Sequence, residues 1–158
     1  MKIKYLFPNK YKSIGWIVLI PSLVLGLVIT MFHIEPAFLD WRVPTIFMDE
    51  FMGEKKLLAM TENNVLNELV GVLIIVSGLL VAFSKEKIED EYIGKTRLES
   101  LVWATYLNYS ILLIALLFVY DMAFFWVMIF NMFTLLLFFI VRFNYLIFKL
   151  NKTESHEE

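Results

Sequence analysis

Residues 100–120 read SLVWATYLNYSILLIALLFVY and contain no charged side chain. A second uncharged stretch, MAFFWVMIFNMFTLLLFFIV at residues 122–141, follows after the single charge of Asp121. A helix needs about 20 residues to cross the roughly 30 Å hydrocarbon core of a bilayer, and both stretches meet that length. The short interval between them therefore predicts a tight hairpin of two transmembrane helices.

Two further apolar stretches lie upstream. Residues 14–32 are uncharged, and residues 69–84 are uncharged but short, so a span there must include Glu68 and its neighbours. The first stretch is longer than the apolar part of a signal peptide, which is about 7–15 residues, and no A-x-A site follows it, so we expect a retained helix. We predict an all-α polytopic membrane protein, a single membrane domain over residues 1–158, with four transmembrane helices at about 14–33, 65–84, 101–120 and 122–146.

The composition excludes several classes of protein. The chain has 158 residues, of which 59% are hydrophobic and 19% are charged, against about a quarter charged in an ordinary soluble domain. A soluble fold of this size cannot cover so much apolar surface. The absence of Cys excludes disulfides and thiolate metal ligands, and no nucleotide-binding, zinc-hydrolase or nucleophile motif is present. We therefore expect no enzyme, catalytic residue, metal or cofactor, and the net charge of −2 gives no sign of direct nucleic-acid binding.

The distribution of basic residues predicts the orientation. Most Lys and Arg residues lie in the N-terminal tail, in the connection at residues 85–100 and near the C-terminus, where a polar tail covers residues 151–158. The loop at residues 34–64 is net acidic, and its basic residues are Arg42, Lys55 and Lys56. Basic residues favour the cytoplasmic side of a membrane. We therefore expect a multi-pass protein of a bacterial inner membrane, with both termini and the connection in the cytoplasm and the loop outside.

The outer loop is predicted to contain no long helix, because Pro36 and Pro44 interrupt it. Its large apolar side chains suggest short segments that lie on the membrane surface. These side chains belong to Phe38, Trp41, Ile46 and Phe47.

Two ionisable residues lie near the outer ends of the first and second spans. Glu68 is the only acidic residue inside a predicted span, and burying a carboxylate is costly enough to suggest a function such as proton coupling. The alternative is that Glu68 lies one turn inside the outer surface and reaches water or caps the helix with Asn67. His33 is on the same side, so it could meet Glu68 as a pH-sensitive pair, or both could be separate interfacial groups. His33 with Glu35 provides two potential metal ligands, whereas a closed zinc site needs four.

Polar side chains also lie well inside the third and fourth spans. Counted from the shared turn, Asn108 and Asn131 lie at similar depths, and with Thr134 they could form hydrogen bonds between the helices. Thr105 and Ser110 could join this network. Such bonds typically hold helices together at about 1 kcal/mol each, and the functional alternative is the polar lining of a small cavity.

The cytoplasmic connection is predicted to extend a span as a helix, with a turn near Gly94. On such a helix Glu86, Glu89 and Asp90 would share one face. These carboxylates could hold a divalent cation, could pair with nearby cations as a solvated face, or could dock a cytoplasmic partner together with Arg97.

Parts of the chain resemble a known group of sequences. The segments are LVAFSKEKIEDEYI at residues 80–93, RLESLVWATY at 97–106, NMFT at 131–134 and FIVRF at 139–143. They resemble an uncharacterised family of small four-span integral membrane proteins of bacteroidete-type bacteria, over most of residues 60–148. The resemblance implies no catalytic residue. It implies a membrane partner for a cytoplasmic helix-turn-helix transcription regulator, since similar proteins are often encoded beside one.

The leading functional hypothesis is a small, non-enzymatic inner-membrane protein with an interaction, sensing or regulatory role. Its partners would be the lipid bilayer, a cytoplasmic protein and a second copy of the chain. The alternative hypothesis is an oligomeric small transporter or channel subunit that uses Glu68 and the polar region around Asn108 and Asn131.

Overall fold

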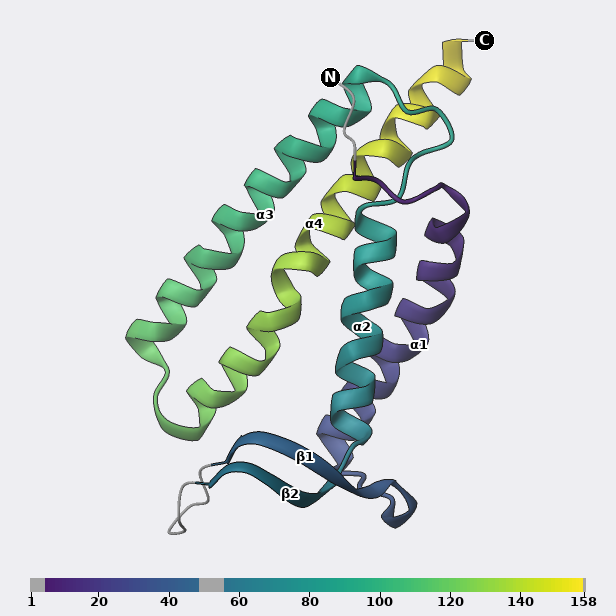
Figure 1. The fold of residues 1–158 in the computed structure, drawn as a ribbon. Helices are drawn as coiled ribbons and strands as arrows, with labels where there is room; N and C mark the ends of the chain where they lie inside the picture. The colour runs from purple at the N-terminus through teal and green to yellow at the C-terminus, as the bar shows by residue number, and fades with distance from the viewer. Residues whose placement is uncertain (1–4, 49–55, 158) are drawn as a thin grey trace. The chain divides into compact units, whose positions relative to one another are not determined.

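The computed structural model describes residues 5–48 and 56–157, which form four α-helices, a short 3-10 helix and two strands (Figure 1). In chain order the elements are α1 (Lys10–Phe32), η1 (Ala37–Leu39), β1 (Asp40–Met48), β2 (Lys56–Asn64), α2 (Leu66–Ala82), α3 (Glu91–Phe118) and α4 (Asp121–Glu157). The four helices agree with the predicted helical class. The two strands depart from it.

Three helices are long and apolar enough to cross a membrane, namely α1, α3 and the Asp121–Lys152 part of α4. α2 is apolar but has 17 residues, which reach roughly 25 Å at about 1.5 Å each. Large apolar side chains on the long helices are exposed, for example Ile17 at 73% and Phe118 at 75%. Extensive exposed apolar surface on helices of this length is typical of contact with lipid, so the chain has the surface of a membrane protein.

The chain divides into two compact units, which we describe separately. The first comprises residues 1–19 and 74–158. Its core includes the almost fully buried side chains of Leu19, Val81, Ala104, Phe139 and Phe143. Two of these are aromatic and stack on one another, with ring centroids 5.8 Å apart.

Within this unit, the N-terminal segment is joined to the residues that follow α2. The backbone N–H of Phe7 donates to the carbonyl of Phe83, and the N–H of Lys85 donates to the carbonyl of Phe7, both at 2.9 Å. Phe7 thereby forms a parallel β-bridge with Ser84. The Asn9 side chain also donates to the Lys85 carbonyl at 2.7 Å. The residues before α1 and those after α2 therefore lie side by side.

Only Val119 and Tyr120 separate α3 from α4. The N–H of Val119 donates to the carbonyl of Ala115 at 2.8 Å, and the Tyr120 hydroxyl donates to the carbonyl of Leu117 at 2.7 Å. Asp121 has a left-handed φ of 56°, a conformation that Asp adopts more readily than most residues. This backbone reversal lets the chain turn within two residues.

The second unit, residues 20–73, contains the β1–β2 hairpin. The strands pair antiparallel, from Asp40 opposite Asn64 to Met48 opposite Lys56. The Thr45 hydroxyl donates to the Thr61 hydroxyl across the strands at 3.0 Å. The prediction for this loop, short surface segments in an all-α fold, did not include the hairpin. β-Branched and aromatic side chains at alternating positions favour strands over helix here.

The predicted helix over the cytoplasmic connection is wrong before residue 91. The segment between α2 and α3 is not helical, so Glu86, Glu89 and Asp90 share no helix face. α3 begins at Glu91 and continues through Gly94, so the predicted turn does not occur there. The expectation that a span extends into the connection as a helix is confirmed for α3.

The helix ends also differ from the predicted spans. α1 begins at Lys10, four residues earlier than predicted, and α4 continues to Glu157 rather than ending at 146. The predictions followed the uncharged runs, whereas Lys, Glu and Asn can extend a helix beyond its apolar part at little cost.

Gly15 of α1 is expected to resist substitution, because α1 and α2 pack closely there. A Cβ at Gly15 would lie 2.8 Å from Val81 Cγ2 and 3.0 Å from backbone atoms of Ser77 and Val81. Backbone atoms cannot move aside, so Gly15→Ala should lower the free energy of unfolding by about 1–3 kcal/mol. The measurement is chemical unfolding in detergent micelles.

Gly78→Ala is the matched control. A Cβ at Gly78 would meet the flexible end of the Leu136 side chain at 2.5 Å, and alanine is favoured over glycine in a helix by about 1 kcal/mol. We expect a much smaller loss at Gly78 than at Gly15. Equal losses would contradict close packing at Gly15.

Candidate functional site

The most buried charge in the described part of the chain is Arg97, in the second turn of α3. Its side chain is 4% exposed, and its guanidinium donates from Nη1 and Nη2 to the two carboxylate oxygens of Glu89 at 2.5 and 3.2 Å. Nη2 also donates to the carbonyl of Ser84 at 3.2 Å. Two parallel bonds to one carboxylate are the strong form of an ion pair. They fix the segment between α2 and α3 against α3.

Glu89 stays ionised in this setting. Its partial burial would raise the pKa of the carboxyl, but hydrogen bonds from Arg97 and from the Glu86 backbone N–H act the other way, as do the charges of Arg97 and Lys85. The net effect lowers the pKa of Glu89 below its ordinary value. The carboxylate is therefore held in the charged form that Arg97 requires.

A second ion pair adjoins the first. Lys12 of α1 donates from Nζ to Glu86 Oε1 at 2.5 Å, and the two side chains are 16% and 12% exposed. The Lys12 ammonium and the Arg97 guanidinium both lie over the Phe143 ring of α4, at 5.9 and 4.9 Å from its centroid. We call these five residues, Lys12, Glu86, Glu89, Arg97 and Phe143, the ion-pair cluster. It joins α1, the connection, α3 and α4 within one unit.

The three carboxylates predicted to share a surface thus have separate internal roles. Glu86 pairs with Lys12, and Glu89 pairs with Arg97. Asp90 is the N-cap of α3 and accepts a hydrogen bond from the Ile93 N–H at 2.7 Å, which stabilises the helix start. The carboxylates were expected to pair with nearby cations on a solvated face. The pairing is present, but the Arg97 side chain that takes part in it is largely buried.

The structure brings together three of the predicted intramembrane residues. The Thr134 hydroxyl donates to Asn108 Oδ1 at 2.6 Å, and Asn131 Nδ2 donates to the same oxygen at 3.3 Å. Asn108 is 2% exposed. The Thr105 hydroxyl instead donates to the Leu101 carbonyl of its own helix. The shared oxygen links α3 to α4 and favours a packing role over a polar cavity lining.

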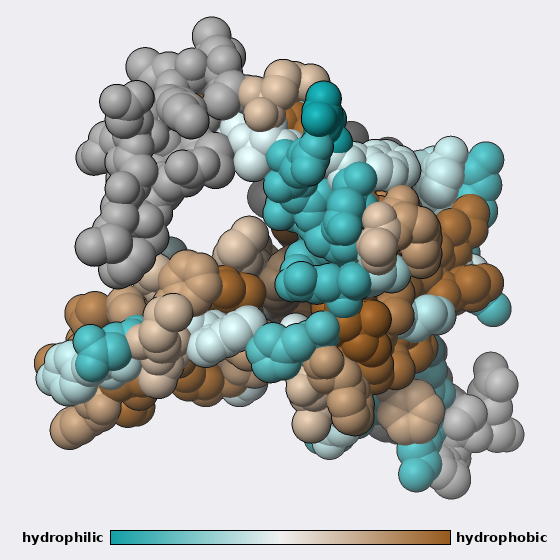
Figure 2. All heavy atoms as spheres, turned by 90° about the horizontal axis from the view of Figure 1, so that it is seen from below, coloured by the Kyte–Doolittle hydropathy of each residue, from teal (hydrophilic) through white to brown (hydrophobic). Residues whose placement is uncertain are grey.

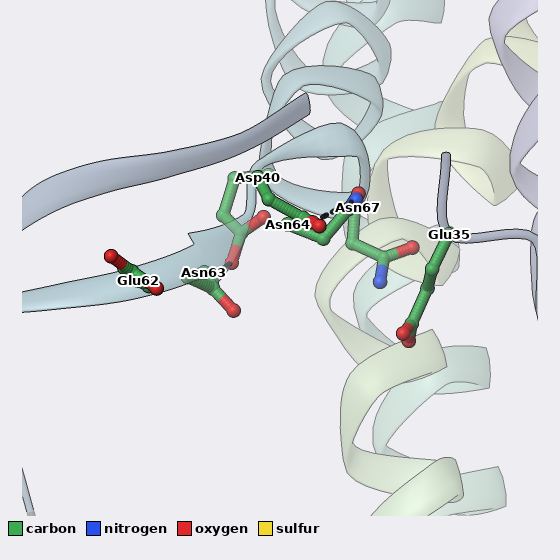
Figure 3. Close-up of a pocket in the computed structure, with 7 residues that line it drawn as sticks. Glu35, Asp40, Glu62, Asn63, Asn64 and Asn67 are labelled. Atoms are coloured by element: carbon green, nitrogen blue, oxygen red, sulfur yellow. Dashed lines mark hydrogen bonds between the residues drawn. The ribbon is translucent and has the colours of Figure 1, made fainter. Parts of the chain in front are cut away.

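The second unit holds a polar pocket of about 330 Å³ at the base of the β hairpin. Its lining consists only of carboxylates and amides, namely Glu35, Asp40, Glu62, Asn63, Asn64, Asn67 and Glu68. Figure 3 shows Glu35 on one side of Asn67, with Glu62 and Asn63 on the other side. The space-filling view from below shows a large hydrophilic patch near the centre of this face, with smaller hydrophilic areas at its edges (Figure 2).

Hydrogen bonds within the pocket position its side chains. Asn64 donates from Nδ2 to Asp40 Oδ1 at 2.7 Å and to the Pro36 carbonyl at 2.9 Å. Its Oδ1 accepts from the Leu66 N–H at 3.3 Å, so this residue ties the hairpin to the start of α2. Among the described residues, no group of three His, Asp or Glu side chains is arranged to hold a metal ion. The pocket is thus an open set of acceptors built on a hydrogen-bonded frame.

The two predicted outer residues are separate. Glu68 lies in the first turn of α2 and accepts a hydrogen bond from Asn63 Nδ2 at 2.7 Å. A carboxylate in the first turn is favoured by the helix dipole. This position agrees with the alternative interpretation of Glu68, in which it lies one turn from the end of its helix. His33 is exposed and follows α1 with a left-handed φ of 50°. Within the described residues, no hydrogen bond or ion pair joins His33 to Glu68.

Sequence reasoning missed the pocket and the Lys12–Glu86 pair. The acidic loop residues were visible in the sequence, but only the strand pairing brings Asp40 and Glu62 near α2. Lys12 and Glu86 are 74 residues apart, and no local pattern indicates that they meet. The alternation in β1, with Val43 and Thr45 at every second position, was the signal that could have indicated the hairpin.

The chain was compared with known protein families, with curated proteins and with solved structures, and none of them matches it. The resemblance to four-span bacterial proteins therefore stays a prediction.

Removing the Arg97 guanidinium is expected to be costly. Arg97→Met leaves the partly buried Glu89 carboxylate without its main partner, and losing hydrogen bonds to a charged group typically costs about 1.5–3 kcal/mol. The measurement is the free energy of unfolding in detergent micelles.

Lys95→Met is the control on the same helix. Lys95 and Glu99 form an exposed pair at 3.9 Å, with side chains 74% and 59% exposed. Exposed pairs of this kind contribute less than about 1 kcal/mol. If Arg97→Met and Lys95→Met lower the free energy of unfolding equally, the ion-pair cluster does not hold the segment between α2 and α3 against α3.

Proposed function

We propose that the chain is a four-span protein of a bacterial inner membrane that acts by binding a cytoplasmic protein rather than by catalysis. In this topology both termini and the connection between α2 and α3 are cytoplasmic, and the β hairpin is outside. α3 and α4 form a transmembrane hairpin held by Asn108. The cytoplasmic partner is of the kind implied by the sequence resemblance, a transcription regulator.

The observation that carries the topology is the contact between the two ends of the α1–α2 segment. Lys12 at the start of α1 pairs with Glu86 beyond the end of α2, and Phe7 hydrogen bonds to Phe83 and Lys85. This contact supports a topology in which both ends of the segment lie on the same side of the membrane. In this topology α1, which is long enough to cross, is followed by a return crossing of α2, and the shortness of α2 is met by thinning of the bilayer or by flanking polar residues.

The basic residues support the same orientation. Eleven of the 14 Lys and Arg residues lie in the N-terminal tail, the connection and the C-terminal part of the chain. The remaining three lie between α1 and α2, namely Arg42, Lys55 and Lys56. The excess of positive charge is expected on the cytoplasmic side.

A partner surface is supported by two exposed side chains, Ile88 in the connection and Tyr92 in the first turn of α3. Ile88 is 75% exposed and Tyr92 is 57% exposed, although both lie in a charged stretch outside the long apolar runs. The neighbouring carboxylates are turned to internal partners, and Arg97 holds the connection in place. A surface that is already ordered loses less entropy on binding. We therefore assign partner contact to Ile88 and Tyr92, supported by the ion-pair cluster.

The topology is tested by labelling, because the chain has no native Cys. Cysteine introduced by Met60→Cys should react with an impermeant maleimide added to spheroplasts. Cysteine introduced by Lys87→Cys should react only after the membrane is permeabilised. Labelling of both from the same side would contradict a crossing by α2, and the reversed pattern would contradict the orientation.

The partner surface is tested by photo-crosslinking in cells. A photoreactive amino acid in place of Ile88 or Tyr92 should give an adduct with one cytoplasmic protein, identified by mass spectrometry. The same amino acid in place of Tyr106, which is 72% exposed on the apolar part of α3, is the control and should not. Charge reversals are less informative, because they would disrupt the ion-pair cluster. The absence of a protein adduct at both positions would contradict the proposal.

A further inference from the structure

The charged side chains of the β1–β2 hairpin that the structure describes lie on one face, which they share with Pro44, Ile46 and Met60. Successive side chains of a strand point to opposite faces, so the register places Arg42 and Glu62 on one face, joined by an ion pair at 2.8 Å. Asp40 falls on the same face. The other face, among the strand residues whose side chains the structure describes, carries no charge. We call it the uncharged face, and it consists of Trp41, Val43, Thr45, Thr61 and Asn63.

The chain holds the hairpin close to the end of a helix. Val65 is the only residue between β2 and α2, and its N–H donates to the Leu39 carbonyl at 3.1 Å. One residue spans at most about 3.5 Å, so the base of the hairpin lies at the depth where α2 begins. Within this unit the strands run crosswise to the first turns of α2 (Figure 1).

An isolated two-stranded hairpin is marginally stable in water. This one is about 30 Å long, at roughly 3.3 Å for each residue of a strand. At its base, Trp41 is 58% exposed and Phe38 of η1 is 78% exposed. The indole N–H of Trp41 donates to the Phe38 carbonyl at 3.2 Å, which satisfies its polar group, and aromatic rings of this kind favour the headgroup region of a membrane.

We propose that the hairpin lies flat on the bilayer, with its uncharged face against the boundary between headgroups and acyl chains. The proposal rests on the four-span topology, because a crossing α2 places the base of the hairpin at a membrane surface. Its crosswise direction then lays the strands along that surface. The opposite arrangement would bring the Arg42–Glu62 pair toward the acyl chains, where desolvation of the two charges is unfavourable.

The test uses spin labels on single cysteines in the full-length chain, reconstituted into phosphatidylethanolamine–phosphatidylglycerol vesicles. Oxygen concentrates in the acyl region and a water-soluble nickel chelate is excluded from it, so the ratio of their collision rates reports contact with lipid. Thr45 and Ile46 are neighbours on opposite faces, and so are Thr61 and Met60. We expect the ratio to be several-fold higher for Thr45→Cys and Thr61→Cys than for Ile46→Cys and Met60→Cys.

Three results would overturn the proposal. Equal, low ratios at all four sites would show that the hairpin stands in water. The reversed pattern would show that the charged face meets lipid. Low collision rates with both reagents at residues 45 and 61 would show that protein, such as a second copy of the chain, covers the uncharged face.

Two features of the design separate bilayer contact from a folding defect and from an error in the predicted orientation. If Thr45→Cys fails to fold because its bond to Thr61 is lost, the pair Val43→Cys and Pro44→Cys reports on the same two faces. The collision ratio does not depend on which leaflet the hairpin contacts. A failure of the predicted orientation, detected by maleimide labelling, is therefore distinguishable from a failure of bilayer contact.

Discussion

The requirement to satisfy the Arg97 guanidinium organises one end of the helical unit. A buried cation without partners costs several kcal/mol, and Arg97 is 4% exposed. Glu89 supplies two acceptors, Ser84 supplies a carbonyl, and Phe143 supplies the face of an aromatic ring. Glu89 and Ser84 belong to the segment between α2 and α3, and Phe143 belongs to α4. The segment between α2 and α3 is consequently held in one place instead of being a solvated loop.

The helices were predictable from sequence, because three of the uncharged runs are as long as a membrane crossing requires, and the fourth, at residues 69–84, is also uncharged although shorter. The link between Asn108, Asn131 and Thr134 was also predictable, since counting from the shared turn places these residues at similar depths. The helix ends were not. Lys10 and Glu91 continue their helices beyond the apolar runs, and hydropathy does not detect such extensions.

Contacts between distant parts of the chain were outside the reach of local patterns. The Lys12–Glu86 pair forms because the residues after α2 lie beside the start of α1. A single sequence contains no signal that predicts this contact. The same holds for the polar pocket, which exists only once β2 pairs with β1. The spacing of Glu86 and Glu89 predicted that they share one face of a helix. Their positions are instead determined by their cationic partners, Lys12 on α1 and Arg97 on α3.

α4 has a mechanical consequence. It is a single helix of 37 residues with neither Gly nor Pro, the residues at which helices most often kink. At about 1.5 Å per residue it is roughly 55 Å long, well beyond the roughly 30 Å of a hydrocarbon core. An unbroken helix behaves as a stiff rod over this distance. If α4 crosses a bilayer, any change in its tilt is thus transmitted to the projecting end as a displacement, which grows with the length of the projecting part.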